Sequence, residues 1–421
     1  MNTQPERNWS GNYTYRAQRV VYPRTVEDIQ NILASSTHVG VIGTRHTFND
    51  VADTDGTLIS LRDVETGIHL DPRLSRVTVT GSVTYGQLAD DLDKRGYALH
   101  NMASLPHISV IGACMTGTHG SGQQHGNLAT AVEGIEFIAA DGTRHQRTRT
   151  EHAGEFDGLV VGLGAYGIVT RMTLNVLPRF EMRQNVYLDL PFEQALTHFD
   201  AIQTSAYSVS YFTDWSSDRI NQVWLKSVVS DKTDSSTLMR DLGAVPASTH
   251  VHPLPDSSAE PCTEQMGVIG AWHDRLPHFR MGFTPSAGQE IQTEYFVDRA
   301  QFTAAARAVR ELGAEIAPAL FTSEIRTVKA DTLWMSPCYK RDGVGIHFTW
   351  KPNQAEVERL TALIEHRLKP FDLRPHWGKL FTLSPERIRP QYERLSDFQR
   401  LVQRYDPDGK FTNAFLRRYV L

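Results

Sequence analysis

Cysteine is scarce in this chain, and its placement does not suggest a disulfide framework. Cys114, Cys262 and Cys338 are odd in number and far apart in the sequence. No Cys-x-x-Cys pair occurs, which argues against a structural zinc site. This usage is typical of a protein from a reducing compartment, so a cytoplasmic location is expected.

Long runs of one chemical character are also missing. No apolar stretch approaches the roughly 20 residues of a membrane-spanning helix. The polar residues 1–8 lack the apolar core of a signal peptide. The formal net charge is −5, and no basic run stands out. These absences argue against a membrane protein and against binding of nucleic acid or an anionic membrane.

The 421 residues, 40% hydrophobic and 22% charged, suit a globular protein of two or three domains. The opening alternates helix and strand patterns, starting with a helix that Thr25 caps and that runs to about Ser35. Further expected elements are strands over 58–61 and 76–80, a helix over 84–95, a β-hairpin over 134–148 and a strand over 168–177. Pro178 ends that strand, and a domain boundary is placed there.

From Arg179 to about Arg374 the residue composition and the expected pattern of elements change. Aromatic strands are expected over 208–215 and 222–229, with a loop-rich polar region over 230–263 and a helix over 302–312. The closing stretch, 411–419, is apolar and aromatic, and we expect it to pack back on the first domain.

The stretch Val39–Asp50 reads Val-Gly-Val-Ile-Gly-Thr-Arg-His-Thr-Phe-Asn-Asp. A buried strand that ends in glycine, followed by backbone N–H groups and small hydroxyls, can form a concavity for an anion such as a pyrophosphate. We therefore predict cofactor contacts from Ile42, Gly43, Thr44, Arg45, His46 and Thr47. The alternative is an ordinary turn with a solvated histidine, because a strand, a glycine and a polar turn are common in sequence.

A second notable stretch, Asn101–Gly122, interleaves four glycines with small hydroxyl residues. Such a stretch lets backbone approach a ligand closely and supplies donors to phosphate. It is neither a Walker loop nor a Rossmann fingerprint. Its neighbouring histidines, His107, His119 and His125, match no zinc spacing, so no metal site is predicted.

Two later strands each place a polar set of side chains opposite an apolar set. In 320–328 the residues Glu324 and Arg326 share a face, and in 343–350 so do His347 and Thr349. If the strands pair, these four side chains form one polar face. The alternative is a solvated outer face with a salt bridge.

The short turn His376-Trp377-Gly378-Lys379 favours a site over a solvated face. Lys379 would add one more cation there. Gly378 would let the backbone pass close to a flat ligand.

Taken together, these residues resemble the flavin-dependent alditol oxidases, the xylitol/sorbitol oxidase group of the vanillyl-alcohol-oxidase superfamily. The resemblance covers nearly the whole chain. Besides the stretches above, it rests on residues 8–12, 164–170, 207–215, 262–265, 276–280, 324–328, 374–379 and 410–415.

The resemblance implies an α+β fold in three parts. Residues 1–178 would form a two-subdomain FAD-binding domain of the PCMH type. Residues 179–375 would form a substrate (cap) domain whose large antiparallel sheet roofs the flavin, and residues 376–421 would return to the first domain. It also implies that the His46 imidazole is bonded covalently to the C8 methyl group of FAD.

Particular residues carry the implied contacts. Those along FAD are Ser104, Ser109, Gly112, Thr116, Gly117, Thr118, His119, Gly120, Val169 and His376. Those around the polyol are Ser104, Glu324, Arg326, Thr349 and Lys379. The implied activity is oxidation of the terminal alcohol of an alditol to the aldose, with hydride passing to FAD and O2 reduced to hydrogen peroxide.

The residue types suit that chemistry. Glu324 can accept two hydrogen bonds from adjacent hydroxyls, and Ser104 and Thr349 can donate or accept. Negative charge develops on the alcohol oxygen during oxidation, so fixed cations belong beside it. Arg326 and Lys379 are the candidates, and either Lys379 or His347 would be the base.

The chain departs from the family at two positions. Thr44-Arg45 stands where relatives carry small residues before the histidine, so Arg45 would either add charge near the pyrophosphate or point to solvent. Cys114 stands in the FAD stretch where relatives have an aliphatic residue, and we expect it to be a buried small hydrophobe without a second flavin link.

Three other functions are open from the sequence. The nearest is an aldonolactone oxidase or dehydrogenase of the same superfamily. The others are a flavin- or polyol-binding protein without turnover, and a metal hydrolase that uses the histidines. In the favoured case the partners are a small polyol and O2, and the protein is a monomer.

Overall fold

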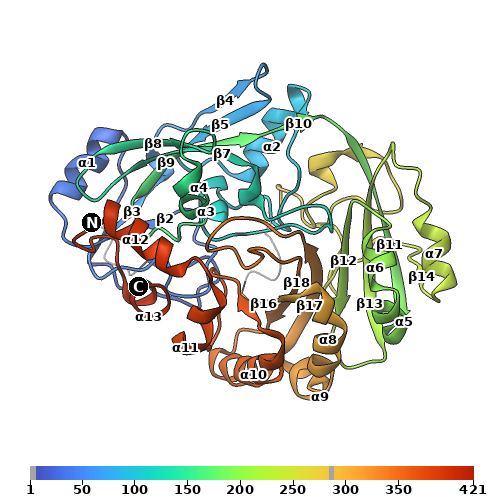
Figure 1. Ribbon diagram of the computed structural model, residues 1–421. Helices are drawn as coiled ribbons and strands as arrows, with labels where there is room; N and C mark the ends of the chain where they lie inside the picture. The colour runs from blue at the N-terminus through green and yellow to red at the C-terminus, as the bar shows by residue number, and fades with distance from the viewer. Residues whose placement is uncertain (1–5, 284–288) are drawn as a thin grey trace.

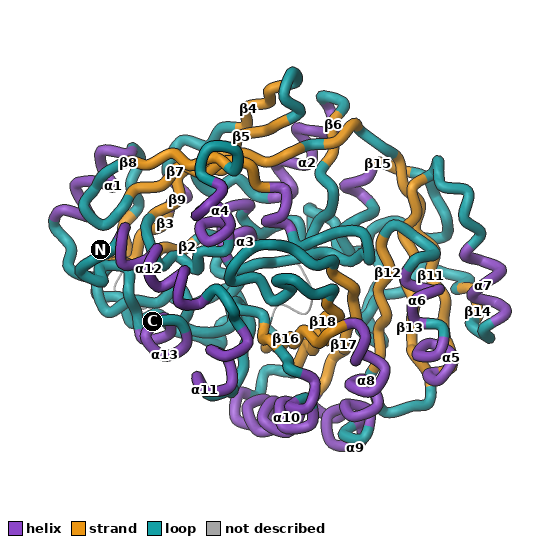
Figure 2. Tube along the Cα trace, viewed as in Figure 1, coloured by secondary structure: helices purple, strands orange, loops and turns teal. Residues whose placement is uncertain are grey.

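The computed structural model describes residues 6–283 and 289–421. Within these residues, the N-terminal part holds three small sheets, of which the third is only a pair of two-residue strands. The middle is built around one large sheet, and the C-terminal helices return to the N-terminal part (Figure 1). The same arrangement is visible in the trace coloured by secondary structure (Figure 2).

The first small sheet is parallel and the second is antiparallel. The parallel sheet has the order β1 (Arg19–Val21), β3 (Thr57–Ser60), β2 (Val39–Ile42). The antiparallel sheet has the order β4 (Ile68–Asp71), β5 (Arg76–Thr80), β9 (Ile168–Asn175), β7 (Val132–Ile138), β8 (Arg144–Thr148). The predicted hairpin over 134–148 is confirmed as β7 and β8, and Gly142 supplies a φ of +83° in its turn.

The helices of this part begin where the sequence predicts. In α1 (Val26–Ala34) the Thr25 side chain accepts from the Asp28 N–H, and Asp28 bonds back to the Thr25 N–H. The same capping box joins Thr84 and Gln87 at the start of α2 (Tyr85–Lys94). The remaining short elements are β6 (Tyr97–Ala98), α3 (Val110–Met115), α4 (Ala153–Val160) and β10 (Leu177–Pro178).

The large sheet has nine strands, all antiparallel. Along it lie β14 (Val245–Pro246), β11 (Glu181–Pro191), β13 (Arg219–Val228), β12 (Ser208–Thr213), β17 (Leu320–Val328), β18 (Gly343–Trp350), β16 (Ile291–Asp298) and β19 (Arg374–Pro375), and β15 (Gly270–Ala271) pairs with β11. The sheet starts just after the predicted boundary at Pro178 and ends where the predicted C-terminal segment begins. The division into three domains remains a prediction.

Helices cover one face of the large sheet, which we call the outer face (Figure 1). They are α5 (Phe192–Thr197), α6 (Phe199–Gln203), α8 (Phe302–Arg310), α9 (Gly313–Ile316) and α10 (Gln354–Arg367). Phe199 packs edge-on against Tyr211 of β12, and Tyr295 of β16 donates to Glu365 of α10 at 2.8 Å. The opposite face, which we call the inner face, looks toward the N-terminal part.

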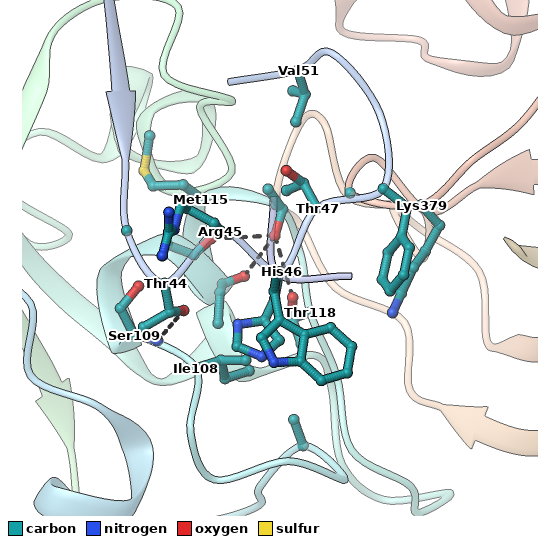
Figure 3. A pocket seen from close by; sticks show the side chains of 18 of the residues that line it. Thr44, Arg45, His46, Thr47, Val51, Ile108, Ser109, Met115, Thr118 and Lys379 are labelled. Atoms are coloured by element: carbon teal, nitrogen blue, oxygen red, sulfur yellow. Dashed lines mark hydrogen bonds between the residues drawn. The ribbon is translucent and has the colours of Figure 1, made fainter. Parts of the chain in front are cut away.

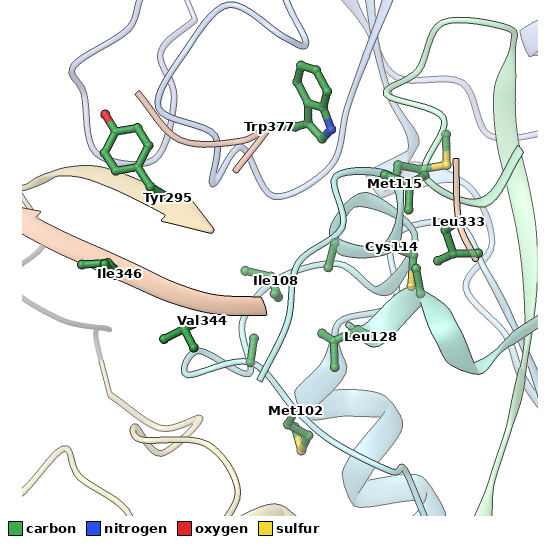
Figure 4. Close-up of a cluster of buried hydrophobic side chains, with 14 of the residues drawn as sticks. Met102, Ile108, Cys114, Met115, Leu128, Tyr295, Leu333, Val344, Ile346 and Trp377 are labelled. Carbon is green, nitrogen blue, oxygen red and sulfur yellow. The ribbon is translucent and has the colours of Figure 1, made fainter. Parts of the chain in front are cut away.

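One buried apolar cluster runs through both parts of the molecule (Figure 4). Met102, Ile108 and Leu128 of the N-terminal part belong to it together with Val344 and Ile346 of β18. Because this core is continuous, the two parts are packed against each other by apolar contacts as well as by the site between them.

The polar region over 230–263 is mostly loop, as predicted, with two short regular elements in it. It holds α7 (Ser235–Asp241) and the short strand β14. Asp234 caps α7 by accepting from the Ser236 and Thr237 N–H groups, and Met239 is its buried apolar anchor. Its two apolar residues, Leu238 and Met239, are adjacent, so the segment shows no helical spacing of apolar residues from which a helix could be recognised.

The C-terminal segment packs back on the N-terminal part, as predicted for residues 411–419. It contains α11 (Pro385–Ile388), α12 (Leu395–Tyr405) and α13 (Ala414–Tyr419). Phe411 is buried with Ile29 and Leu33 of α1, and the Val39 N–H donates to the Lys410 carbonyl at 2.8 Å. None of the helices in the described ranges is long and apolar enough to span a bilayer.

Candidate active site

A deep cavity lies where the inner face of the large sheet meets the loops of the N-terminal part. Its lining includes the loop around His46, parts of the stretch 103–119, strands β16, β17 and β18, and the turn 376–379. The segments singled out in the sequence, far apart along the chain, therefore converge on one space.

The loop after β2 is held in an unusual backbone conformation. Arg45 has a φ of +62°, and the Trp9 N–H donates to its carbonyl at 2.9 Å. The Ser109 N–H donates to Thr44 Oγ1 at 3.2 Å, which joins this loop to the glycine-rich stretch (Figure 3). These contacts fix where the next residue, His46, presents its ring.

His46 projects its imidazole into the cavity. The ring is stacked on Trp9. Both Nδ1 and Nε2 are buried, and neither has a hydrogen-bond partner among residues 6–283 and 289–421. Burial, with a smaller effect from the Lys379 charge, lowers the pKa of His46 to about 3, so the ring is neutral and keeps a free lone pair. Buried polar atoms are seldom left unpaired, and this ring is placed to bind a partner.

The Arg45 side chain has a role that the sequence did not predict. Its guanidinium pairs with Glu6 and donates to the Arg7 carbonyl at 3.3 Å. The side chain thus ties the loop to the N-terminal segment, and the Glu6 carboxylate pairs its charge.

Most residues expected along the cofactor do line the cavity. They are Ile42, Gly43, Thr44, Arg45, His46, Thr47, Ser104, Ser109, Gly112, Thr116, Thr118, His119, Val169 and His376. Gly117 and Gly120 do not. A Cβ on Gly120 would lie 2.4 Å from the Met102 carbonyl oxygen, and Gly117 has a φ of +66°, so these two glycines serve the course of the chain.

Cys114 is turned away from the cavity. It is buried, and its sulfur lies 3.4 Å from the Tyr85 hydroxyl. Burial raises the pKa of the thiol to about 12, so it stays protonated. Cys114 is therefore the small hydrophobe that the sequence predicted.

The inner face of the large sheet carries a buried polar row. Glu324 of β17 lies directly opposite His347 of β18, which lies opposite Glu294 of β16. Directly opposed residues share a face of the sheet. Arg326 and Thr349 join them in lining the cavity, and all five are buried. The alternative of a solvated outer face is therefore wrong.

Ion pairs connect this row. The Arg326 guanidinium donates to Glu294 Oε1 at 2.8 Å and to Ser104 Oγ at 3.4 Å, and its Nε lies 3.5 Å from Glu324 Oε2. His278 Nε2 lies 2.7 Å from Glu324 Oε1. Burial opposes ionisation of Glu324, but Arg326 and His278 outweigh it and hold the pKa of this carboxyl well below its ordinary value. The site thus keeps a fixed carboxylate beside a fixed cation.

A glutamine sets the proton positions at the other end of the row. Lys379 Nζ donates to Gln292 Oε1, and the Gln292 amide group donates to Glu290. His347 Nε2 lies 3.2 Å from the same Gln292 oxygen and must therefore donate to it. This leaves His347 Nδ1 unprotonated, and this buried atom has no partner among the described residues.

Burial shifts both candidate bases. It lowers the pKa of Lys379 to about 8, aided by the charge of Arg326. It lowers the pKa of His347 to about 3. The lysine is thus the group whose proton exchanges near neutral pH.

Sequence reasoning missed Gln292, Glu294 and His278. The first two alternate with Ile291, Thr293 and Tyr295, the same period-two pattern that marked β17 and β18, so a signal existed. His278 lies in a loop, where no periodicity marks it. Glu294 also takes a hydrogen bond from His119 at 3.0 Å, which links the row to the glycine-rich stretch.

The cavity fits the predicted flavin. Besides both His46 nitrogens, Thr47 Oγ1 is buried there with no partner in the part of the chain that the structure describes. A Cβ on Gly43 or Gly112 would come within 2.4 or 2.7 Å of Ser109 Oγ, so a side chain at either position would displace that hydroxyl. Unpaired polar atoms and bare backbone along one cavity are what a large ligand with a pyrophosphate and a flat ring requires.

The three histidines considered for a metal have separate contacts. His119 bonds to Glu294, His125 packs against the Tyr207 ring at 4.1 Å, and His107 Nε2 lies 2.9 Å from the Met281 carbonyl oxygen. Among residues 6–283 and 289–421, no three histidine, cysteine or acidic side chains gather as ligands would.

Comparisons with known proteins agree with this site. A family model described as FAD binding domain matches residues 17–147, and one described as D-arabinono-1,4-lactone oxidase matches residues 285–419. An alditol oxidase of Streptomyces sp. (strain IKD472 / FERM P-14339) is 44% identical over 413 residues, 97% of each chain. An L-gulonolactone oxidase of Bos taurus is 24% identical over 436 residues, 98% of this chain and 97% of its own.

Among solved structures, a cholesterol oxidase from B. sterolicum superposes with a TM-score of 0.76 at 12% identity, over 99% of this chain and 97% of its own. This likeness shows the fold alone. It confirms the predicted α+β architecture, a PCMH-type FAD-binding domain with a large antiparallel sheet.

Proposed function

Because this chain belongs to the alditol oxidase family of FAD-binding oxidoreductases, we propose that it oxidises the terminal primary alcohol of linear alditols such as xylitol and sorbitol to the aldose. The flavin supplies the hydride acceptor and passes the electrons to O2, which leaves as hydrogen peroxide. We further propose a cytoplasmic monomer, in line with three free and buried thiols.

The observation that carries the proposal is the buried polar row on the inner face of the sheet. A polyol is uncharged and must be held by hydrogen bonds, and this row offers a carboxylate, a guanidinium, an ammonium and hydroxyls within one cavity. Glu324, Ser104 and Thr349 would bind hydroxyls. Arg326 and Lys379 would face the oxygen that gains negative charge as the hydride leaves.

The pKa values favour Lys379 as the base. A catalytic base works best when its pKa lies near the working pH, and that of Lys379 is about 8. His347 has an unprotonated Nδ1 in the cavity, but a pKa of about 3 makes it a much weaker base. In this mechanism the hydroxyl proton passes to the neutral Lys379 amine, while Arg326, always protonated, orients the oxygen.

We also propose that FAD lies along the cavity residues of the His46 loop and the glycine-rich stretch, and that His46 carries it covalently. Support comes from the neutral, unpaired and buried imidazole. The link would hold the flavin next to the polar row and raise its reduction potential.

An aldonolactone oxidase or dehydrogenase is the second candidate, favoured by the lactone oxidase family model over residues 285–419. Purified enzyme should be incubated with xylitol, sorbitol and L-gulono-1,4-lactone, and peroxide and flavin bleaching measured. We expect bleaching and peroxide with the alditols. Turnover of the lactone alone would favour the second candidate, and bleaching without peroxide would indicate a dehydrogenase.

A further inference from the structure

A buried lysine behind Glu324 has no part in the mechanism above. Lys226, on β13, is 0% exposed. Its Nζ lies 2.7 Å from the Leu276 carbonyl oxygen, 2.8 Å from that of Pro277 and 3.1 Å from His278 Nδ1. An ammonium group has three protons and no lone pair, so these three contacts satisfy its charged form.

Two neighbours decide where the proton of the His278 ring lies. The Glu324 carboxylate can only accept, so the proton of the neutral ring sits on Nε2. The ammonium form of Lys226 can only donate, so it supplies the matching donor to Nδ1, although burial lowers the pKa of Lys226 to about 7. The Nε2–H points at Glu324 Oε1, 2.7 Å away. The ring packs edge-to-face against both Trp224 and Phe212, with centroids 5.2 and 5.4 Å away. It is therefore locked in orientation as well as in tautomer.

We propose that Lys226 and His278 are a positioning pair for the substrate: Lys226 fixes the tautomer of His278, and His278 holds the Glu324 carboxylate in the pose that binds polyol hydroxyls. The inference rests on the proposed function in one respect, that Glu324 contacts the polyol. One oxygen of Glu324 is held by His278 and the other faces Arg326, so the remaining lone pairs keep a fixed direction. Hydroxyls that match this direction are bound without cost for ordering the carboxylate.

The competing explanation is that Lys226 only stabilises the turn at 276–277, since two of its contacts are to carbonyls there. The two explanations predict different tautomers of His278 after Lys226 is removed. If Lys226 acts on the tautomer, its removal leaves only Glu324 to favour the Nε2 proton, and part of the population then carries the proton on Nδ1. If Lys226 only supports the turn, the tautomer of His278 stays as it is.

The first test reads the tautomer directly. Holoenzyme labelled with ¹⁵N-histidine is studied by NMR, and the His278 signals are identified by their loss in His278→Gln. We expect a protonated Nε2 in the wild type and a shift toward protonated Nδ1 in Lys226→Met. An unchanged tautomer in Lys226→Met would overturn the proposal. This readout needs no turnover, so it stands even if the enzyme oxidises no alditol.

The second test uses the ability of glutamine to replace the N–H of His278 Nε2 without having tautomers. In the wild-type background, Lys226→Met should raise the KM for xylitol about tenfold, with kcat changed less, because a hydrogen bond to a charged group is disturbed. In the His278→Gln background the same substitution should change the KM less than about twofold. Equal increases in both backgrounds would refute a role through the tautomer.

Two further variants complete the design. Lys351→Met is a matched control, because this exposed lysine also donates to a backbone carbonyl, that of Pro318 at 2.7 Å. This substitution should leave the KM unchanged.

If Lys226→Met does not fold, His278→Gln is compared with His278→Phe. Gln should keep the KM within a few-fold of wild type, and Phe should raise it about tenfold. Equal effects would overturn the proposal, whereas a wild type inactive on every alditol would count against the proposed function only.

Discussion

Trp9 lies stacked on His46, with ring centroids 4.9 Å apart and planes inclined by 19°. The indole covers one face of the imidazole and limits its rotation. Neither imidazole nitrogen has a partner within residues 6–283 and 289–421, so in this part of the chain packing, not hydrogen bonding, holds the ring in place. A neutral histidine held this way is suited to form a bond to a cofactor that enters the cavity.

The first prediction is that flavin is attached to His46. After acid precipitation the yellow colour should stay with the protein pellet, and the intact mass should exceed that of the chain by one FAD. His46→Ala should release its flavin to the supernatant and should be reduced by alditol more slowly, because the link raises the flavin potential. His107→Ala, whose ring contacts a backbone carbonyl elsewhere, is the control. Release of all flavin from the wild type would show that no covalent bond forms.

The second prediction separates binding from chemistry at Glu324. Glu324→Gln keeps the shape but removes the charge that strengthens hydrogen bonds to hydroxyls. The KM for xylitol or sorbitol should rise about tenfold, and that for a short diol should rise less, because a diol reaches fewer of these contacts. Steady-state kinetics on both substrates decide. Equal losses would instead assign Glu324 a structural role or one in the chemical step.

The third prediction is a pH dependence set by Lys379. Burial, then the charge of Arg326, lowers its pKa to about 8, so the amine is mostly protonated below this pH and mostly neutral above it. If the neutral amine takes the hydroxyl proton, the rate of flavin reduction should rise about tenfold per pH unit below 8 and level off above. Anaerobic stopped-flow reduction at saturating xylitol measures this. A rate that falls above pH 8 would mean that the ammonium form is the active one.

Local patterns were enough to predict much of the fold. Capping boxes and tight turns depend only on residues that are close in the sequence. The helix starts at Thr25 and Thr84 and the Asp141-Gly142 turn could therefore be predicted from the sequence. The alternation of Glu324 and Arg326 likewise predicted a polar face. The alternation could not show whether that face is buried. Its burial depends on a distant loop and on the N-terminal part, which pack over it.

The site residues that could not be predicted from the sequence were missed for one physical reason. Glu294 acts because β16 pairs with β18 and Arg326 reaches across both strands, which is a long-range property. In the sequence, Lys226 is an ordinary polar residue of a strand. Its contact with His278 depends on a loop that is distant in the sequence. Gly117 and Gly120 lie outside the cavity lining, and their contact with FAD stays a prediction, because glycine can support a tight chain path as well as expose backbone to a ligand.

Lys379 sits where the turn 376–379 meets the polar row. Its Nζ donates to Gln292 and lies 4.9 Å from the centroid of the Phe48 ring, so its stem is packed and its amine is directed along the row. The alternative to a catalytic role is that Lys379 only packs at the edge of the cavity. Substitutions that keep or remove its charge distinguish the two.

The final prediction is that Lys379→Met slows flavin reduction by xylitol about 10²–10³-fold, the usual loss when one group that stabilises developing charge is removed. FAD should stay bound and attached, because Lys379 contacts neither the His46 ring nor the glycine-rich stretch through any hydrogen bond found among residues 6–283 and 289–421. Lys379→Arg is the matched variant: it keeps the positive charge but cannot release a proton near neutral pH. If Lys379 is the base, Arg should be nearly as slow as Met, and the pH dependence near 8 should vanish in both. If the residue only supplies charge, Arg should recover most of the rate. A Lys379→Met enzyme that is reduced at nearly the wild-type rate, with an unchanged pH profile, would remove the lysine from the mechanism and leave His347 Nδ1 as the base.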